Sequence, residues 1–314
     1  MRGNRMTKAQ MVGTRHKTVL LKETIDGLNL KSNGVVIDGT FGGGGHSLEI
    51  CKRYLDVKIV ALDQDKNVFA ERDRFKNCDT TFVNDNFRNI DKVLGQMGVG
   101  EVDGIILDLG LSSDQLDVSG RGFSFMKDEP LIMTMKENPR PEDVTAKDVV
   151  NTWSEQSLTD IIYGYGEEKF SRRIAKGIVE ARQKAKIETT FDLVKIISDA
   201  VPAVYKRGRL HFATRTFQAI RIAVNDELGA LAEGLDKGFK LLKANGRMSV
   251  ISFHSLEDRI VKRFYKEKVE EGKAKLINKK VILASGDEIK NNPRSRSAKL
   301  RIIEKTTAKA GQVK

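Results

Sequence analysis

Short apolar runs alternate with segments of helical periodicity over the first third of the chain. The runs are rich in Val, Ile and Leu, as expected for parallel strands that are covered on both faces. They occupy residues 35–38, 58–63, 80–87 and 102–111, and the helical segments between them occupy residues 47–55, 68–75 and 90–97. This alternation predicts an α/β fold with a doubly wound, mostly parallel sheet.

Four consecutive glycines, Gly42 to Gly45, lie between the first predicted strand and the first predicted helix. Glycine permits positive φ, and the free N–H groups of a helix's first turn can bind phosphate, ribose or carboxylate groups. The match to GxGxxG is incomplete, because Ser47 stands where the third glycine would be, and four glycines can also form a simple loop. The second apolar run ends in Asp63, which is placed to accept hydrogen bonds from both hydroxyls of a ribose. NAD and S-adenosylmethionine both carry such a ribose, so these residues leave both cofactors open.

Acidic or aromatic residues stand at the ends of the four predicted strands: Asp38, Asp63, Phe87 and Asp108. Because the carboxyl ends of parallel strands share one edge of a sheet, these side chains should converge on one crevice. A strand-end aspartate can also cap the next helix, and Phe87 can be an ordinary core residue. Their joint placement favours a nucleoside pocket in which Phe87 borders the adenine.

Helical patterns replace the alternation between residues 116 and 210, which we predict to be a helical subdomain inserted into a discontinuous domain made of residues 1–115 and 211–314. One predicted helix carries a single apolar stripe and a strongly basic opposite face. The basic residues are Lys169, Arg172, Arg173, Lys176, Arg182, Lys184 and Lys186. This face is either a solvated surface or a substrate contact, and its expected place over the carboxyl edge of the sheet favours contact with the substrate.

The sheet is expected to resume after residue 211. A helix from about residue 213 has an apolar face that should cover the sheet, made of Phe217, Ile220, Val224, Leu228 and Leu231. Part of its polar stripe should reach the crevice, and this stripe consists of Thr214, Gln218, Arg221 and Asn225. A fifth strand is predicted at 246–253, and Ser255 and Asp258 then have the spacing of a capping box. Segments 275–283 and 297–303 predict an antiparallel edge.

The charge of the chain is concentrated at its two ends. The 314 residues are 39% hydrophobic and 31% charged, as in soluble globular proteins, with a net charge of +12. Residues 1–17 hold five basic and no acidic residues, and residues 259–314 hold 17 basic and 6 acidic residues. Basic ends suit a polyanionic partner such as RNA, or else they serve only solubility.

The sequence gives no sign of a membrane span, a secretory leader or a metal centre. No apolar run approaches the roughly 20 residues of a membrane span, and the N-terminus has no signal-peptide core. Cys51 and Cys78 form no CxxC pattern, and the four histidines lack metal-ligand spacing. We therefore expect a cytoplasmic protein in a reducing compartment, without a structural metal.

Several ordered blocks are more specific than these patterns. They are Asp38-Gly-Thr-Phe-Gly with Gly44-Gly-His-Ser47, Asp108-Leu-Gly-Leu-Ser-Ser with Gln115-Leu-Asp117, Arg121-Gly-Phe-Ser-Phe125, Tyr165-Gly-Glu-Glu168, Ala213-Thr-Arg-Thr-Phe-Gln218, Ser252-Phe-His-Ser-Leu-Glu-Asp-Arg259 and Asn292-Pro-Arg-Ser-Arg-Ser-Ala298. From about residue 16 to 304 the chain closely resembles the ribosomal RNA small subunit methyltransferase H (MraW) family. Members of that family methylate the exocyclic N4 amine of a cytosine in 16S rRNA near the ribosomal P site.

The resemblance implies a class I methyltransferase fold that uses S-adenosylmethionine, with an inserted helical substrate-recognition domain. It implies cofactor contacts from Gly44, Gly45, His46, Asp63, Phe87, Asp108 and Gln115. The implied partner is 16S rRNA or the small ribosomal subunit, and a homodimer is also considered. The chain departs from the family pattern at Ile132 and Thr134, where an acid and an arginine that could touch substrate are usual.

For the chemistry itself, the candidate residues are Asp108, in a loop whose acceptors would hold the amine, and His254, a neighbouring base for the released proton. The sulfonium is itself strongly activated, so the reaction could also proceed without a dedicated base. The candidate substrate contacts are Arg172, Arg173, Arg215 and Asn225. Two rival functions fit parts of the pattern. A NAD-dependent dehydrogenase could use the same sheet but leaves the basic helix and tail without a purpose, whereas a non-catalytic RNA-binding or ribosome-assembly factor would use the basic surface alone.

Overall fold

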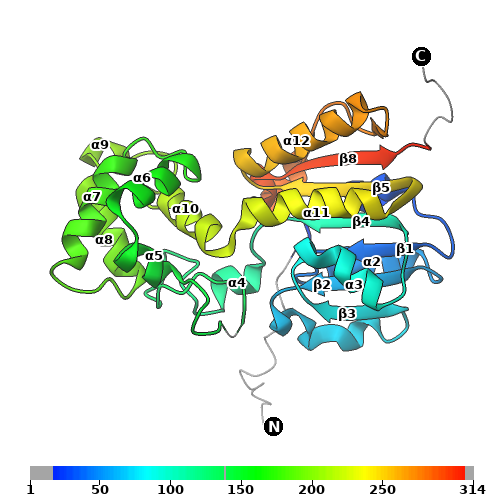
Figure 1. The fold of residues 1–314 in the computed structure, drawn as a ribbon, viewed down its shortest axis with the longest axis horizontal. Helices are drawn as coiled ribbons and strands as arrows, with labels where there is room; N and C mark the ends of the chain where they lie inside the picture. Colours follow the sequence, from blue (N-terminus) through cyan, green and yellow to red (C-terminus); the bar gives the residue numbers. More distant parts are fainter. Residues whose placement is uncertain (1–16, 138, 308–314) are drawn as a thin grey trace, which may run out of the picture.

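The computed structural model describes residues 17–137 and 139–307. Most of the basic N-terminal segment and the last seven residues therefore lie outside the described part of the chain. Figure 1 shows two bodies side by side, a sheet covered by helices and a cluster of helices. In the described ranges, no helix is both long and apolar enough to cross a membrane.

One eight-stranded sheet forms the centre of the larger body, in the order β3-β2-β1-β4-β5-β8-β6, with β7 also paired to β8. Neighbouring strands from β3 to β5 are parallel, whereas β8 runs antiparallel to β5 and β6. The strands are β1 Val35–Asp38, β2 Lys58–Asp63, β3 Thr80–Asn84, β4 Val102–Asp108, β5 Leu242–Ser252, β6 Ala274–Leu276, β7 Ile282–Leu283 and β8 Lys299–Lys305. The predicted doubly wound sheet with an antiparallel edge is confirmed.

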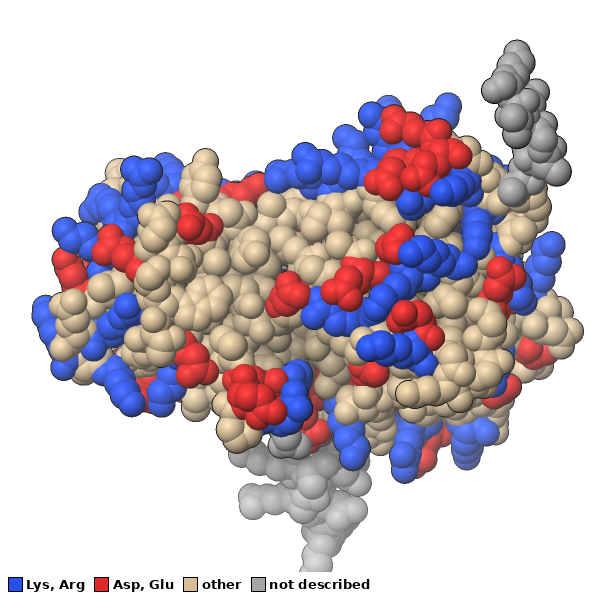
Figure 2. Space-filling view, viewed as in Figure 1, with Lys and Arg blue, Asp and Glu red and all other residues tan. Residues whose placement is uncertain are grey.

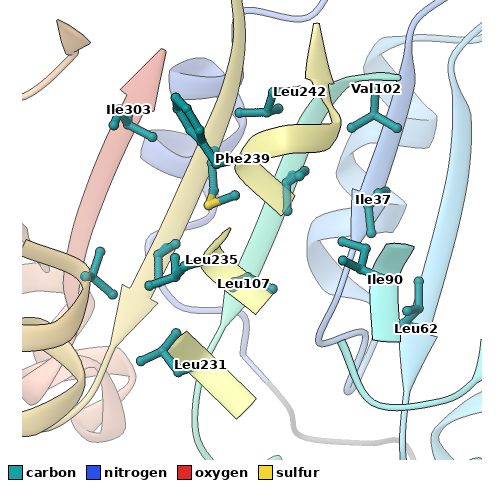
Figure 3. Close-up of a cluster of buried hydrophobic side chains, with 14 of the residues drawn as sticks. Ile37, Leu62, Ile90, Val102, Leu107, Leu231, Leu235, Phe239, Leu242 and Ile303 are labelled. Atoms are coloured by element: carbon teal, nitrogen blue, oxygen red, sulfur yellow. The ribbon is translucent and has the colours of Figure 1, made fainter. Parts of the chain in front are cut away.

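Successive residues of the parallel strands are buried in opposite layers, which explains why their sequences are continuously apolar. In β1, Ile37 joins the cluster under α3 (Ile90–Gln96), α11 (Glu227–Leu241) and α12 (Ser255–Glu270). Its neighbour Val36 packs on the opposite side, against α1 (Leu21–Leu28) and α2 (Gly45–Arg53). Figure 3 shows the first of these layers, where Leu231, Leu235 and Phe239 of α11 lie against the strands.

The smaller body is a helical cluster with its own hydrophobic core. Its helices are α5 Ala146–Thr152, α6 Glu155–Gly164, α7 Ser171–Arg182, α8 Thr190–Ala200, α9 Ala203–Lys206 and α10 Thr214–Asn225, and short α4 (Ser113–Asp117) leads into it. The core includes Phe217 and Ile220 of α10, so it crosses the boundary predicted at residue 210. The prediction that these two residues cover the sheet is wrong, because the helix breaks at Asp226, where φ is 46°, and only α11 lies on the sheet.

Several helices and strands begin or end at other residues than predicted. The third strand ends at Asn84, and Phe87 begins a short 3₁₀ helix, η3 (Phe87–Asn89). Residues Lys66–Phe75 form 3₁₀ turns, η2, in place of an α-helix. The fourth strand ends at Asp108 and the fifth begins already at Leu242.

Two local interactions differ from the sequence-based expectation. The capping box of α12 is formed by His254 and Glu257, so the predicted pair Ser255 and Asp258 is wrong. A disulfide joins Cys51 and Cys78, whose Cα atoms lie 5.7 Å apart. This bond links the end of α2 to the turn before β3. A spacing of 27 residues carries no signal of that pairing.

Candidate functional site

A pocket opens at the carboxyl ends of β1, β2 and β4, where parallel sheets bind ligands. Six of the seven predicted cofactor residues line it: Gly45, His46, Asp63, Phe87, Asp108 and Gln115. The seventh, Gly44, lies directly behind this lining as the N-cap of α2. The structure therefore brings together residues that are up to 71 positions apart in the sequence.

The glycine turn has the tight packing that requires glycine at position 44. Gly44 has φ of +68°, and a Cβ atom there would lie 2.6 Å from Cζ of Phe41 and 3.0 Å from Cζ of Phe75. A Cβ atom on Gly45 would lie 1.7 Å from Oγ1 of Thr18. The turn thus lets the first turn of α2 face the pocket with its N–H groups, the arrangement that favours anionic and hydroxyl groups.

Asp63, at the tip of β2, is held in place by backbone donors. Its Oδ2 accepts from N–H of Gly42 at 2.9 Å and its Oδ1 from N–H of Asp65 at 2.9 Å. Burial raises the pKa of Asp63 to about 6, although these two hydrogen bonds oppose the rise. Each oxygen retains a second lone pair, so the carboxylate can still accept hydrogen bonds from a diol.

Phe87 forms the wall beyond Asp63. Phe87 packs so closely on two glycines that neither has room for a side chain. A Cβ atom on Gly39 would lie 3.2 Å from Cβ of Phe87, and a Cβ atom on Gly234 would lie 2.5 Å from its Cδ2. The ring is therefore fixed between the end of β1 and α11, and it lines the pocket as a flat apolar surface.

Asp108, at the tip of β4, is a buried acidic group with acidic neighbours. Burial, followed by the charges of Asp38 and Glu257, raises the pKa of Asp108 well above its ordinary value. Its Oδ2 lies 3.8 Å from Nδ1 of His46, and its Oδ1 is buried with no hydrogen-bond partner among the described residues. A buried acceptor without a partner, on the pocket wall, is suited to receive a hydrogen bond from a ligand.

Gln115 belongs to a buried network that sequence reasoning missed. Its side chain accepts from N–H of Ser112 at 3.0 Å and donates to Asp65 at 3.3 Å. Asp65 forms an ion pair with Arg121, which also donates to three successive backbone carbonyls, those of Thr134, Met135 and Lys136. The loop that contains Thr134 is therefore fixed by an arginine, and no spacing in the sequence indicates this pairing.

Both ends of the described chain add to the pocket wall, which the sequence analysis also missed. Lys17, Thr18, Asn292 and Arg294 line the pocket, and Thr18 lies against Gly45 of the glycine turn. Nζ of Lys17 donates to the carbonyl of Asn291 at 3.1 Å, and Nδ2 of Asn292 donates to the carbonyl of Lys17 at 2.9 Å. The block Asn292-Pro-Arg294 was a signal, but it carried no indication of a role.

His254, the second candidate proton acceptor, is not among the lining residues. Its Nδ1 accepts from N–H of Glu257 at 3.4 Å, and its Nε2 lies 3.1 Å from Oε1 of the same residue. Burial favours a raised pKa for Glu257, but His254, N–H of Phe253 and Arg221 together lower it. His254 therefore caps α12, and the lowered pKa of Glu257 keeps the carboxylate of Glu257 negatively charged near Asp108.

One group of three potential metal ligands occurs in the described ranges, namely Glu227, His254 and Glu257, whose ligand atoms lie within 4.8 Å of one another. Arg221 already pairs with Glu227 through two hydrogen bonds of 2.8 Å. The guanidinium therefore supplies the positive charge that two neighbouring carboxylates need.

Of the four predicted substrate contacts, only Asn225 lines the pocket. Its side chain accepts from N–H of Met135 at 2.8 Å and donates to the carbonyls of Met133 and Arg221. Arg215 donates to the carbonyl of Glu167 at 2.7 Å, within the contact between helical body and α12. Arg172 and Arg173 are exposed on α7, which Figure 1 shows at the end of the molecule away from the sheet.

Comparison with known proteins gives consistent matches along nearly the whole chain. A family model described as the MraW methylase family matches residues 13–306. Three relatives carry the name ribosomal RNA small subunit methyltransferase H. The protein of Ruminiclostridium cellulolyticum is 48% identical over 312 residues (93% of this chain, 99% of the relative), and that of Clostridium botulinum 48% over 309 residues (93% and 99%). The protein of Limosilactobacillus fermentum is 44% identical over 315 residues (94% and 99%).

Proposed function

Because this chain belongs to the MraW methylase family, we propose that it transfers a methyl group from S-adenosylmethionine to small-subunit ribosomal RNA. The finer part of the proposal is the acceptor, the exocyclic N4 amine of a cytosine in 16S rRNA near the P site. The observation that carries the proposal is the buried Oδ1 of Asp108, an acceptor without a hydrogen-bond partner, on the wall of the pocket that Asp63 and the glycine turn also line. A cytoplasmic location follows from the substrate.

The pocket residues fit the proposed cofactor. The carboxylate of Asp63 can accept hydrogen bonds from the ribose hydroxyls, and the fixed ring of Phe87 offers an apolar face to the adenine. The turn at Gly44 is too tight for a Cβ atom because it packs on Phe41 and Phe75, and its neighbours Gly43 and Gly45 line the pocket. When bound, S-adenosylmethionine supplies a methyl group that is already activated by the positive sulfonium.

The chain's own task is to orient the amine. The lone pair of cytosine's exocyclic nitrogen is delocalised into the ring, so the rate depends mostly on holding this nitrogen in line for attack. Oδ1 of Asp108 can accept a hydrogen bond from the amine, and its raised pKa makes this carboxylate a better proton acceptor than an ordinary aspartate. The cytosine would have to leave its stack to reach such a pocket.

The helical body is proposed to grip the RNA around the extruded base. Figure 2 shows Lys and Arg gathered over the helices on the left and along α12, with a mostly uncharged surface between them. Arg172 and Arg173 are exposed residues of α7, one of the helices of this body. Their distance from the pocket suits contacts with phosphates remote from the target base.

The test is transfer of labelled methyl from S-adenosylmethionine to small ribosomal subunits from cells that lack this protein. We expect one methyl per particle, located by mass spectrometry on N4 of a 16S rRNA cytosine. Asp108→Ala should abolish transfer while S-adenosylhomocysteine still binds. A protein that binds the particles and transfers nothing would refute the proposal and favour the non-catalytic assembly factor.

A further inference from the structure

The last residue of α9 and the loop that follows it form an exposed basic patch, which we call the α9–α10 loop (Lys206–His211). All six residues of this loop are exposed, and three of them are the cations Lys206, Arg207 and Arg209. None of the six lines the cofactor pocket. The sequence from residue 200 to residue 225 contains no aspartate or glutamate. The loop therefore presents charge of a single sign, which suits a polyanion.

The three cations of the loop have no partners in the described part of the chain. Neither a hydrogen bond nor an ion pair joins their side chains to another residue of the ranges 17–137 and 139–307. On α7, by contrast, Lys176 pairs with Glu180, and Arg182 donates to two backbone carbonyls. The cations of the loop can therefore bind phosphates without first breaking a contact within the protein.

Buried contacts fix both ends of the α9–α10 loop. At its start, the hydroxyl of Tyr205 donates to the carboxylate of Glu168, a residue with no exposed surface. At its end, N–H of Ala213 donates to Nδ1 of His211 at 3.3 Å, and the imidazole stacks on the ring of Phe125 with centroids 4.6 Å apart. Because the loop is already ordered, less conformational entropy is lost when it binds a ligand.

One helix connects the loop to the cofactor pocket. Helix α10 begins at Thr214, shortly after the loop, and ends at Asn225, which lines the pocket. At 1.5 Å per residue, the two ends of this helix lie about 17 Å apart. A strand in a nucleic-acid helix advances about 3.4 Å per nucleotide, so about five nucleotides cover that distance.

We propose that the α9–α10 loop binds phosphates of the RNA strand that carries the target base, within about five nucleotides of that base. This inference deepens the proposed function and rests on it. An RNA strand offers one negative charge at each nucleotide, and the loop offers three unpaired cations within four residues. His211 adds a ring and no charge, because burial lowers its pKa and leaves the imidazole neutral at pH 7.

The first measurement is the affinity of the full chain for small ribosomal subunits from cells that lack this protein, at several salt concentrations. The test variant carries Arg207→Gln together with Arg209→Gln. The matched control carries Lys31→Gln together with Lys52→Gln, which removes two exposed charges near the amino ends of β1 and β2. Calorimetry with S-adenosylhomocysteine checks that both variants keep the folded cofactor pocket.

We expect the test variant to reduce the steepness of the plot of log affinity against log salt by about 1.4, at about 0.7 for each contact with a single-stranded phosphate. The control should leave this steepness unchanged, and both variants should bind S-adenosylhomocysteine like the parent protein.

The second measurement locates the loop on the RNA. Arg209→Cys, labelled with an iron chelate that generates hydroxyl radicals, should cleave 16S rRNA within about five nucleotides of the methylated base. Lys31→Cys, labelled in the same way, should not cleave there.

Three outcomes would overturn the inference. An unchanged salt dependence in the test variant would mean that the loop binds no phosphate, and an equal change in the control would indicate a general effect of charge. Cleavage from position 209 that is absent, or remote from the methylated base, would assign the loop to a ribosomal protein or to another RNA segment. A parent protein that binds the particles and transfers no methyl group would instead refute the proposed function itself.

Discussion

Replacing Asp38 by asparagine tests whether ionisation of a buried aspartate at a strand end destabilises the folded protein. Asp38 ends β1 beneath the glycine turn and is 1% exposed. Its Oδ2 accepts from Oγ of Ser47 at 2.6 Å and its Oδ1 from N–H of Thr40 at 3.4 Å. Burial raises the pKa of Asp38 to about 6 in spite of these donors. Asparagine has the same shape and can still accept from Ser47, but it cannot ionise.

The magnitude follows from the two pKa values. The ordinary value is 3.8 and the folded value is about 6, so the folded protein holds a proton that the unfolded chain has released over this pH range. At about 1.4 kcal/mol per pKa unit, ionisation of Asp38 costs the folded state about 3 kcal/mol. The cost is absent below pH 3.8, grows as the pH rises, and is complete above pH 6 to 7.

The assay is urea unfolding of the parent protein and Asp38→Asn at intervals between pH 4 and pH 8. We expect the variant to gain stability relative to the parent protein by about 3 kcal/mol over this range. Asp160→Asn, the same chemical change on an exposed face of α6, controls for general effects of charge. A stability difference that stays flat, or that falls with rising pH, would refute the reasoning, because it would mean that Ser47 and the helix terminus stabilise the ionised form.

The same substitution should change catalysis. The negative charge of Asp38 is the second cause, after burial, of the raised pKa of Asp108. Removing that charge should lower the pKa of Asp108, so the acidic limb of the single-turnover methyl-transfer rate should move to lower pH. A limb that stays in place would separate Asp108 from the titrating step.

Three further predictions concern the turn, the buried ion pair and the basic helix. Gly44→Ala should cost about 3 kcal/mol in urea unfolding, because of its positive φ and lack of room, whereas Gly95→Ala in α3, with nothing within 4 Å, should be neutral or slightly stabilising. Arg121→Ala should cost about 3–5 kcal/mol in the same assay, because it leaves a buried carboxylate without its partner. Arg172→Ala should leave stability unchanged, because Arg172 is exposed, and should reduce the steepness of the plot of log affinity for small subunits against log salt by about 1. Its control, Arg182→Ala, should cost about 1–2 kcal/mol of stability, because the guanidinium of Arg182 donates to two carbonyls near the end of α5.

The sheet and the strand-tip acids could be predicted because each depends on a pattern of adjacent residues. A strand covered on both faces must be apolar throughout, and its last residue must face the ligand edge, so Asp63 and Asp108 are recognisable from their own neighbours. Phe87 was placed in the pocket for a partly wrong reason. It lies beyond the strand, in a 3₁₀ turn, and reaches the pocket because it fits against Gly234 of α11.

The extent of the helical body could not be predicted from periodicity. Residues 213–231 repeat at helical spacing on one face, which favours a single helix on the sheet. The chain instead turns at Asp226, a non-glycine residue in the left-handed region, where no glycine or proline marks the break. Arg221 and Glu227 form their ion pair across this turn, so the break is stabilised by a contact that exists only after folding.

The contribution of the two chain ends to the pocket wall has a similar origin. Lys17 and Arg294 are 277 residues apart, and although Arg294 belongs to the block Asn292–Ala298, nothing in that block indicates a place in the pocket. What selects them is the path of β8, which pairs antiparallel with β5 and so brings the preceding segment back to the ligand edge, where α1 also begins. A basic residue near the end of the chain therefore lines the pocket or stays outside it according to its place relative to β8. Arg294 accordingly lines the pocket, whereas Arg296, two residues further along and also exposed, does not.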